Sequence, residues 1–153
     1  MDWAETVLIS VAMKLLCFQA KRFWWKPFSQ TLPSTEQPDA ETEVRDAVVV
    51  FVHAEERDES AGQRFSVMRQ SIKHIKWLAR KRGLRNIVLH SFTHLGGKNA
   101  SAEFAENFLT ELVQRLRAAG FQVWLTPFGY FCEWDLSVYG DSLAKVWKEI
   151  GQV

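Results

Sequence analysis

His94 is the side chain of this sequence that is best placed to do chemistry. It lies in residues 91–95 (SFTHL), directly after an apolar run that predicts a buried strand. A histidine on a loop at the end of a strand can polarise a substrate or exchange a proton near neutral pH. His53 instead ends another apolar run, and a histidine there is more typical of core or edge packing. We therefore take His94 as a candidate catalytic residue.

Cys132 could act as a nucleophile, because a thiolate attacks esters and a nearby cation lowers the pKa of a thiol. A cysteine in a strand also serves as a small apolar residue, and both interpretations stay open. The other cysteine, Cys17, lies far away in the sequence. Neither belongs to a CxxC or Cys–His spacing, so we expect no disulfide framework and no metal site.

The common catalytic motifs are absent. The sequence has no GxSxG, HExxH, Walker or GxGxxG pattern, which argues against the usual serine-nucleophile, zinc and dinucleotide sites. Residues 96–98 (GGK) look like a fragment of a phosphate loop, but they lack the first glycine at the required offset and the following Ser or Thr. We expect an ordinary flexible loop there and no cofactor.

Composition limits the chain to one globular domain and narrows its partners. Of the 153 residues, 47% are apolar and 24% are charged, which suits a single core. The net charge of +1 is too small to attract a long duplex, so DNA is not an expected partner. The apolar run at 7–16 is interrupted by Lys14 and is too short to span a bilayer. We expect a cytoplasmic protein that does not insert into membranes.

The elements that must position these side chains alternate between strands and helices. Apolar residues three and four positions apart predict two amphipathic helices, at about 64–82 and from about 104 to Gly120. Residues 127–129 (PFG) form a turn, so the strands on either side are expected to pair as a hairpin. A short helix is expected at 142–150. Strands are expected at about 13–19, 47–54, 86–91, 121–126 and 130–138.

This order of elements predicts an α/β fold, either a mixed β-sheet or a partly closed barrel, with the two amphipathic helices packed on it. Residues 29–44 are polar with two prolines and predict a surface loop. Residues 21–26 combine basic and aromatic side chains, which could stack on a nucleotide end or fill a core or interface.

Two segments carry a specific resemblance. Residues 91–95 (SFTHL) and 126–130 (TPFGY) resemble the PFAHLSS and APFGYYK signatures of the archaeal threonyl-tRNA synthetase editing domain. Similarity continues at residues 13–16, 46–52 and 116–123, so it covers nearly the whole chain from Met13 onward. The resemblance implies the fold that this family shares with the D-aminoacyl-tRNA deacylases. We expect an N-terminal extension at 1–12 and a stand-alone, divergent editing-like domain at 13–153.

The resemblance implies a pocket for the aminoacylated 3′ end of tRNA. In the family, an activated water hydrolyses a mischarged seryl ester with help from the 2′-hydroxyl of the tRNA, so positioning and carbonyl polarisation suffice. This implies a freestanding hydrolase that removes serine from threonine tRNA, with His94 as the pocket histidine. Family members usually form homodimers, and we expect one here. Substrate contacts are expected from Phe92, Thr93, Phe128, Gly129, Tyr130, Phe131 and Cys132.

The sequence departs from the family pattern at positions where the resemblance implies residues that support hydrolysis. Cys132 stands where the family has a lysine, Phe131 replaces a tyrosine, and Lys145 falls on a family glutamate. The family's HSD at the end of the first strand appears as QAK at 19–21. One interpretation is that Lys145 reaches the pocket from the opposite side and restores the cation as a second catalytic residue. The other is a catalytically lapsed binding module for an aminoacylated tRNA end or a small aminoacyl ligand.

Overall fold

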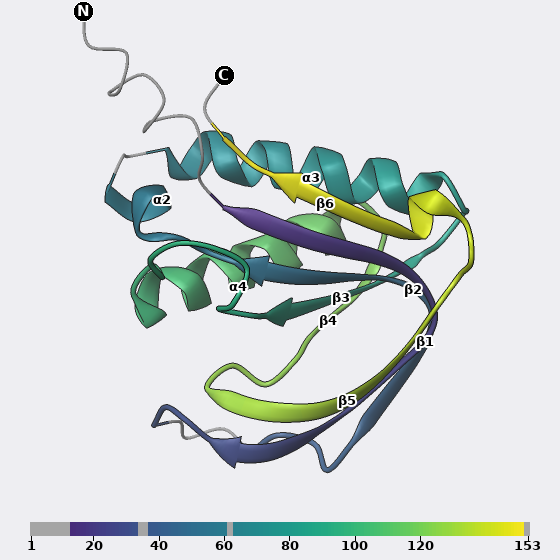
Figure 1. The fold of residues 1–153 in the computed structure, drawn as a ribbon, viewed down its shortest axis with the longest axis horizontal. Coiled ribbons are helices and arrows are strands. Elements are labelled where there is room, and N and C mark those ends of the chain that lie inside the picture. The colour runs from purple at the N-terminus through teal and green to yellow at the C-terminus, as the bar shows by residue number, and fades with distance from the viewer. Residues whose placement is uncertain (1–12, 34–36, 61–62, 152–153) are drawn as a thin grey trace, which may run out of the picture.

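The computed structural model describes residues 13–33, 37–60 and 63–151, so the predicted extension at 1–12 lies outside the described residues (Figure 1). The elements of the described chain are β1 (Lys14–Gln30), β2 (Thr42–His53), α2 (Glu56–Ser60), α3 (Arg64–Arg80), β3 (Asn86–Ser91), α4 (Ala102–Ala118), β4 (Gln122–Leu125), β5 (Tyr130–Val138), a 3-10 turn (Ser142–Ala144) and β6 (Lys145–Glu149).

These strands form one mixed sheet of order β4-β3-β2-β1-β5, and β6 pairs with the first half of β1. The strands β2, β3 and β4 run parallel, with α3 and α4 as their crossover helices. The strand β1 is antiparallel to β2, β5 and β6. Figure 1 shows that β1 bends and that its second half, with β5, turns away from the helices. The predicted α/β fold with a mixed sheet is confirmed.

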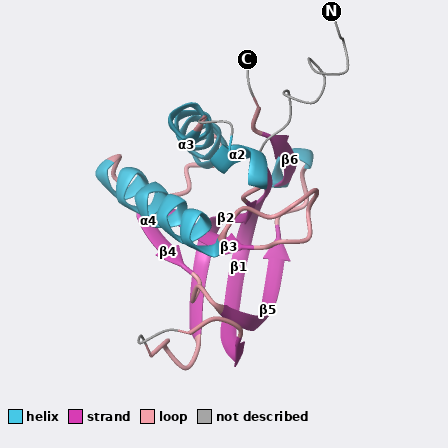
Figure 2. Ribbon diagram, turned by 90° about the vertical axis from the view of Figure 1, so that its left-hand side faces the viewer, coloured by secondary structure: helices cyan, strands magenta, loops and turns pink. Residues whose placement is uncertain are grey.

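The helices α3 and α4 lie together against one face of the sheet (Figure 2). Their apolar stripes pack on alternate residues of β1, β2 and β3, as both predicted amphipathic patterns require. Ser101 caps the N-terminus of α4, and its hydroxyl accepts a hydrogen bond from the Phe104 N–H at 3.2 Å. Gly83 and Gly120 follow the two helices with φ of 66° and 101°, a conformation that glycine adopts without strain.

The predicted hairpin at residues 127–129 is wrong. The strand β4 extends the parallel ladder beside β3, whereas β5 crosses to β1, where Trp134 lies opposite Trp25. The turn itself forms, because Gly129 has φ of 85° and its carbonyl accepts the N–H groups of Thr31 and Leu32 at 2.6 and 3.1 Å. The turn-forming residues at 127–129 therefore predicted correctly that the chain changes direction there. They did not predict the strand with which β5 pairs.

The predicted closing helix at 142–150 is also wrong. Only Ser142–Ala144 forms a helical turn, and Lys145–Glu149 is the edge strand β6. Val146 packs into the core beneath the helices while Trp147 next to it is exposed, which is the alternation of a strand. The backbone of β1 at Lys14–Phe18 needs a second partner, and β6 supplies it.

Two other segments differ from expectation. The first strand does not end near residue 19 but continues to Gln30, so the basic and aromatic residues 21–26 lie within β1. Part of the predicted loop at 29–44 is likewise strand. The acidic residues after His53 form the short helix α2. Among the described residues, no helix is long and apolar enough to cross a membrane.

Candidate functional site

The face of the sheet away from the helices is rich in aromatic rings, and we call it the aromatic face. It is built from alternate residues of β1, β2, β3 and β5 together with Trp124 of β4, which point the same way because side chains alternate along a strand. The ring of Phe51 lies 5.2 Å from that of Phe92 and 5.2 Å from that of Trp134. The other main members are Phe23, Trp25, His90 and Trp124.

The first motif segment leaves this face at the end of β3. Phe92 is half-buried, and its N–H donates to the Val52 carbonyl at 2.9 Å, which extends the pairing of β2 and β3 by one residue. His94 packs edge-on against Phe92 with the ring centroids 5.2 Å apart. Thr93 and His94 are exposed. The structure thus places the predicted histidine in contact with solvent at the border of the aromatic face.

A buried hydrogen bond joins the residue before the first motif segment to the start of the second. The Nδ1 of His90, on the strand before the first segment, lies 2.9 Å from the Oγ1 of Thr126, the first residue of the second. Burial lowers the pKa of His90 to about 4, so the ring is neutral near pH 7. The N–H of Thr126 also donates to the Leu89 carbonyl at 3.0 Å. Segments that are more than thirty residues apart in the sequence therefore meet at a fixed distance.

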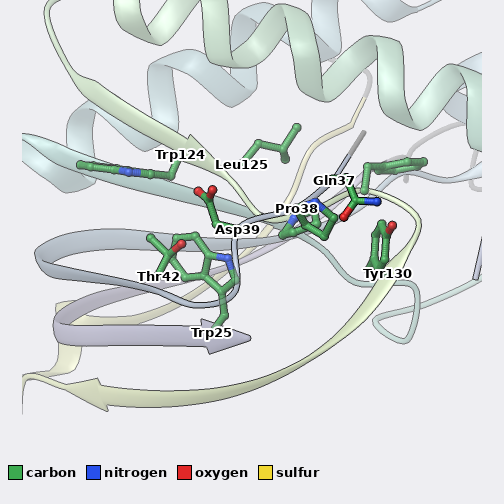
Figure 3. Close-up of a pocket in the computed structure, with 10 residues that line it drawn as sticks. Trp25, Gln37, Pro38, Asp39, Thr42, Trp124, Leu125 and Tyr130 are labelled. Carbon is green, nitrogen blue, oxygen red and sulfur yellow. The ribbon is translucent and has the colours of Figure 1, made fainter. Parts of the chain in front are cut away.

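The second motif segment lines a pocket of about 240 Å³ (Figure 3). Phe128 and Tyr130 form part of its wall, and the indole rings of Trp25 and Trp124 lie at different sides of it. The carboxylate of Asp39 points toward the space between these tryptophans. The remaining lining residues are Gln37, Pro38, Thr42, Leu125 and Pro127.

The residues after Tyr130 alternate between the two sides of β5. The side chain of Cys132 packs with the aromatic face, whereas that of the preceding residue, Phe131, is 62% exposed. The structure therefore separates two residues that were both expected to contact substrate. Burial raises the pKa of the Cys132 thiol above its usual range, so the group is protonated near neutral pH and is a poor nucleophile.

Lys145 begins β6 and pairs with Phe18, a residue that also packs against the aromatic face. Its Nζ donates to the Tyr139 carbonyl at 3.4 Å, a long and therefore weak hydrogen bond, and the side chain is exposed. Cys132 pairs with Pro27, nine positions further along β1. Lys145 thus lies on the aromatic-face side of the sheet but near the opposite end of β1 from Cys132, and the structure does not bring its ammonium to Cys132.

Comparison with known proteins identifies the family. Residues 13–150 match the sequence model of one protein family, the archaea-specific editing domain of threonyl-tRNA synthetase. The chain belongs to this editing-domain family. It is 31% identical over 140 residues to the threonine–tRNA ligase of Hyperthermus butylicus, covering 88% of this chain and 22% of that protein. It is 28% identical to the ligase of Thermofilum pendens, covering 90% and 22%. The chain therefore spans about a fifth of the length of these relatives.

A solved structure, that of the c-Myc DNA unwinding element binding protein, has a similar fold. The TM-score is 0.60 at 13% sequence identity, with 89% of this chain and 97% of that chain covered. At this identity the similarity shows the fold alone. It confirms the deacylase-like fold that the sequence motifs of the editing-domain family implied.

Sequence reasoning located both motif segments of this editing-domain relative but missed much of what lies between them. It did not assign Phe51, His90 or Trp124 to the site, although alternation along neighbouring strands was a signal for the first two. Within the described ranges there is no group of three or more His, Cys, Asp or Glu side chains that could hold a metal ion.

Proposed function

We propose that this chain is a freestanding editing hydrolase that removes a mischarged amino acid from tRNA, with serine on threonine tRNA as the default substrate. The observation that carries the proposal is the His90–Thr126 hydrogen bond, which joins the residue before the first motif segment to the first residue of the second. Membership of the editing-domain family supports the same conclusion.

The pocket beside Trp25 and Trp124 suits the 3′-terminal adenosine. Unpaired bases are recognised by stacking on aromatic side chains and by hydrogen bonds to their edges. The Asp39 carboxylate is an acceptor at this pocket, and the exocyclic amino group of adenine is a donor. The ester carried by the ribose would then lie near Phe128, Tyr130 and the aromatic face.

Hydrolysis in this proposal uses water and not a protein nucleophile. Cys132 is a neutral thiol, so it does not compete with water for the ester carbonyl. His94 is exposed at the border of the face and its ring can orient the water or accept its proton. We retain Lys145 as a proposed second catalytic residue, whose flexible side chain would have to exchange the Tyr139 carbonyl for the substrate.

A second candidate function is a binding module that holds an aminoacylated tRNA end or a small aminoacyl ligand without cleaving it. The observation that favours it is the position of Lys145, whose ammonium is bonded to Tyr139 and not directed at Cys132. In this alternative the aromatic face and the pocket bind the ligand, and no group stabilises the developing oxyanion.

The proposal includes a homodimer and action in the cytoplasm, where aminoacyl-tRNA is made. Exposed aromatic residues such as Trp134 and Trp147, at 38% and 45%, would suit an interface between two copies. Release of serine from seryl-tRNA specific for threonine, by the wild type and a His94→Ala variant, tests the proposal. Light scattering at micromolar concentration tests the dimer, and a monomer would contradict it.

A further inference from the structure

A buried ion pair lies beneath the loop that carries His94. The Nζ of Lys14, on β1, donates to Oε1 of Glu55 at 2.8 Å and also contacts Oε2. The two side chains are only 10% and 8% exposed. Burying two charges removes their hydration, and the attraction between them offsets only part of that cost. A buried ion pair therefore contributes little net stability compared with an apolar pair of the same volume. What such a pair does provide is a fixed geometry.

The glycine turn of the loop rests directly on this pair. A Cβ added at Gly96 would lie 2.5 Å from Cε and 2.7 Å from Nζ of Lys14. A Cβ added at Gly97 would lie 3.2 Å from Oε1 of Glu55. The absence of a side chain at Gly96 and Gly97 lets the loop backbone lie this close without displacing the Lys14 or Glu55 side chain. The two glycines therefore let the loop pack directly on the ion pair.

Asp58 fixes the backbone on both sides of the pair. Its Oδ2 accepts the Glu55 N–H at 2.7 Å and its Oδ1 accepts the N–H of Met13, next to Lys14, at 3.0 Å. One carboxylate of α2 thus ties the start of β1 to the residues after β2. The backbone segments that carry the two ion-paired side chains are thereby linked to each other.

Both ends of the loop are tied to the same place. At its far end the Ala100 N–H donates to the Ala54 carbonyl at 3.0 Å, and the Glu56 N–H donates to the Lys98 carbonyl at 2.9 Å. The Nε2 of His53 lies 2.7 Å from Oδ1 of Asn99. The loop is thus attached to the end of β2, and the ion pair fills the space beneath its middle.

We infer that Lys14 and Glu55 are positioning residues that hold the loop at 92–100 so that His94 stays against Phe92 at the aromatic face. The catalytic part of this inference rests on the proposed function, whereas the loop-holding part does not. His94 is two residues from Gly96, so a shift of the glycine turn displaces the imidazole. A displacement of about 1 Å is enough to lower a rate by about 10²-fold.

The test uses two variants and a matched control. Glu55→Gln removes one charge and keeps the shape, and Gly96→Ala pushes Lys14 away while both charges remain. Gly140→Ala is the control, because a Cβ there meets nothing within 4 Å. Amide hydrogen exchange of residues 95–100 and the steady-state kcat and KM for seryl-tRNA are measured on each full-length protein.

We expect both variants to exchange the loop amides about tenfold faster or more, with unchanged exchange in β2 and β3. We also expect kcat to fall about tenfold or more while KM changes less than about twofold, because the group displaced acts on the reacting ester and not on tRNA binding. The Gly140→Ala control keeps both wild-type values.

Unchanged loop exchange in both variants would overturn the inference, and so would faster exchange with an unaltered kcat. If Glu55→Gln does not fold, Gly96→Ala decides the same question. If the wild type cleaves no aminoacyl-tRNA, the proposed function fails, and the exchange data still decide whether the ion pair holds the loop.

Discussion

The indole of Trp134 meets the ring of Phe51 nearly edge-on, with an interplanar angle of 74° and centroids 5.2 Å apart. This contact joins β5 to β2 across the aromatic face, although the two strands are not neighbours in the sheet. The curled half of the sheet is therefore linked to β2 by a side-chain contact as well as by its pairing with β1.

Trp134→Ala removes this contact and should lower the free energy of unfolding by about 1–2 kcal/mol, since an aromatic pair contributes about 0.5–1.5 kcal/mol beyond its burial. Trp134→Phe keeps an aromatic ring, so its free energy of unfolding should fall by less than half as much as that of Trp134→Ala. Urea denaturation followed by circular dichroism measures both. Equal losses in the two variants would show that the edge-on contact with Phe51 does not hold β5 in place.

Lys145→Ala tests the proposed replacement for the family lysine. If the ammonium stabilises the oxyanion, kcat for seryl-tRNA should fall about tenfold or more. Lys148→Ala is the matched control, because Lys148 lies on the same strand but pairs with Leu15, whose side chain points toward the helices. A lower kcat in Lys145→Ala, with a wild-type kcat in Lys148→Ala, supports the proposal. Identical kinetics in the two variants would remove Lys145 from the catalytic residues.

Two buried groups give opposite dependences of stability on pH. Burial raises the pKa of Asp58 to about 6, so between about pH 4 and 6 the folded chain keeps a proton that the unfolded chain releases. The contribution of Asp58 to the free energy of unfolding therefore falls as the pH rises through this range. Burial lowers the pKa of His90 to about 4, so between about pH 4 and 6.5 the unfolded chain binds a proton that the folded chain does not, and the contribution of His90 to the free energy of unfolding rises with pH.

Single variants should separate the two effects. Asp58→Asn leaves His90, and the free energy of unfolding should then rise more steeply between pH 4.5 and 6.5 than in the wild type. His90→Gln leaves Asp58, and the same quantity should rise less or fall. Urea denaturation at pH 4.5, 5.5 and 6.5 gives the three slopes. Parallel pH profiles for the three proteins would contradict both shifted pKa values.

Cys132→Ala should retain more than about half of the wild-type kcat, because a thiol whose pKa is raised by burial is not a nucleophile near neutral pH. The intact thiol should also react slowly with iodoacetamide at pH 7.5. Mass spectrometry of a reaction stopped with acid would reveal any aminoacyl thioester. Detection of that thioester on Cys132, or loss of turnover in the alanine variant, would assign the cysteine a covalent role.

The sequence predicted those parts of the fold that depend on local pattern. The periodicity of apolar residues located α3 and α4, and the β-branched run before His53 located a central strand. Val146 and Trp147 fit both a helix and a strand, because spacings over five residues do not distinguish the two. Their strand conformation was decided by the free edge of β1 at the other end of the chain, which no local pattern contains.

The same limit applies to the candidate site. His94 and the second motif segment were predictable because loops at strand ends carry function and because the segments match a family signature. The ion pair of Lys14 with Glu55 was not, since it joins residues 41 positions apart and depends on the absence of a side chain at Gly96. The contact of Lys145 with the Tyr139 carbonyl was likewise not predicted from sequence spacing.

Release of radiolabelled serine from seryl-tRNA specific for threonine, with correctly charged threonyl-tRNA as the control substrate, tests the central claim most directly. The account predicts release of serine above the uncatalysed rate, no release of threonine, and a loss of about 10²-fold in kcat/KM for His94→Ala with unchanged thermal stability. No serine release at high protein concentration, or release that His94→Ala leaves intact, would contradict an editing hydrolase that depends on this histidine.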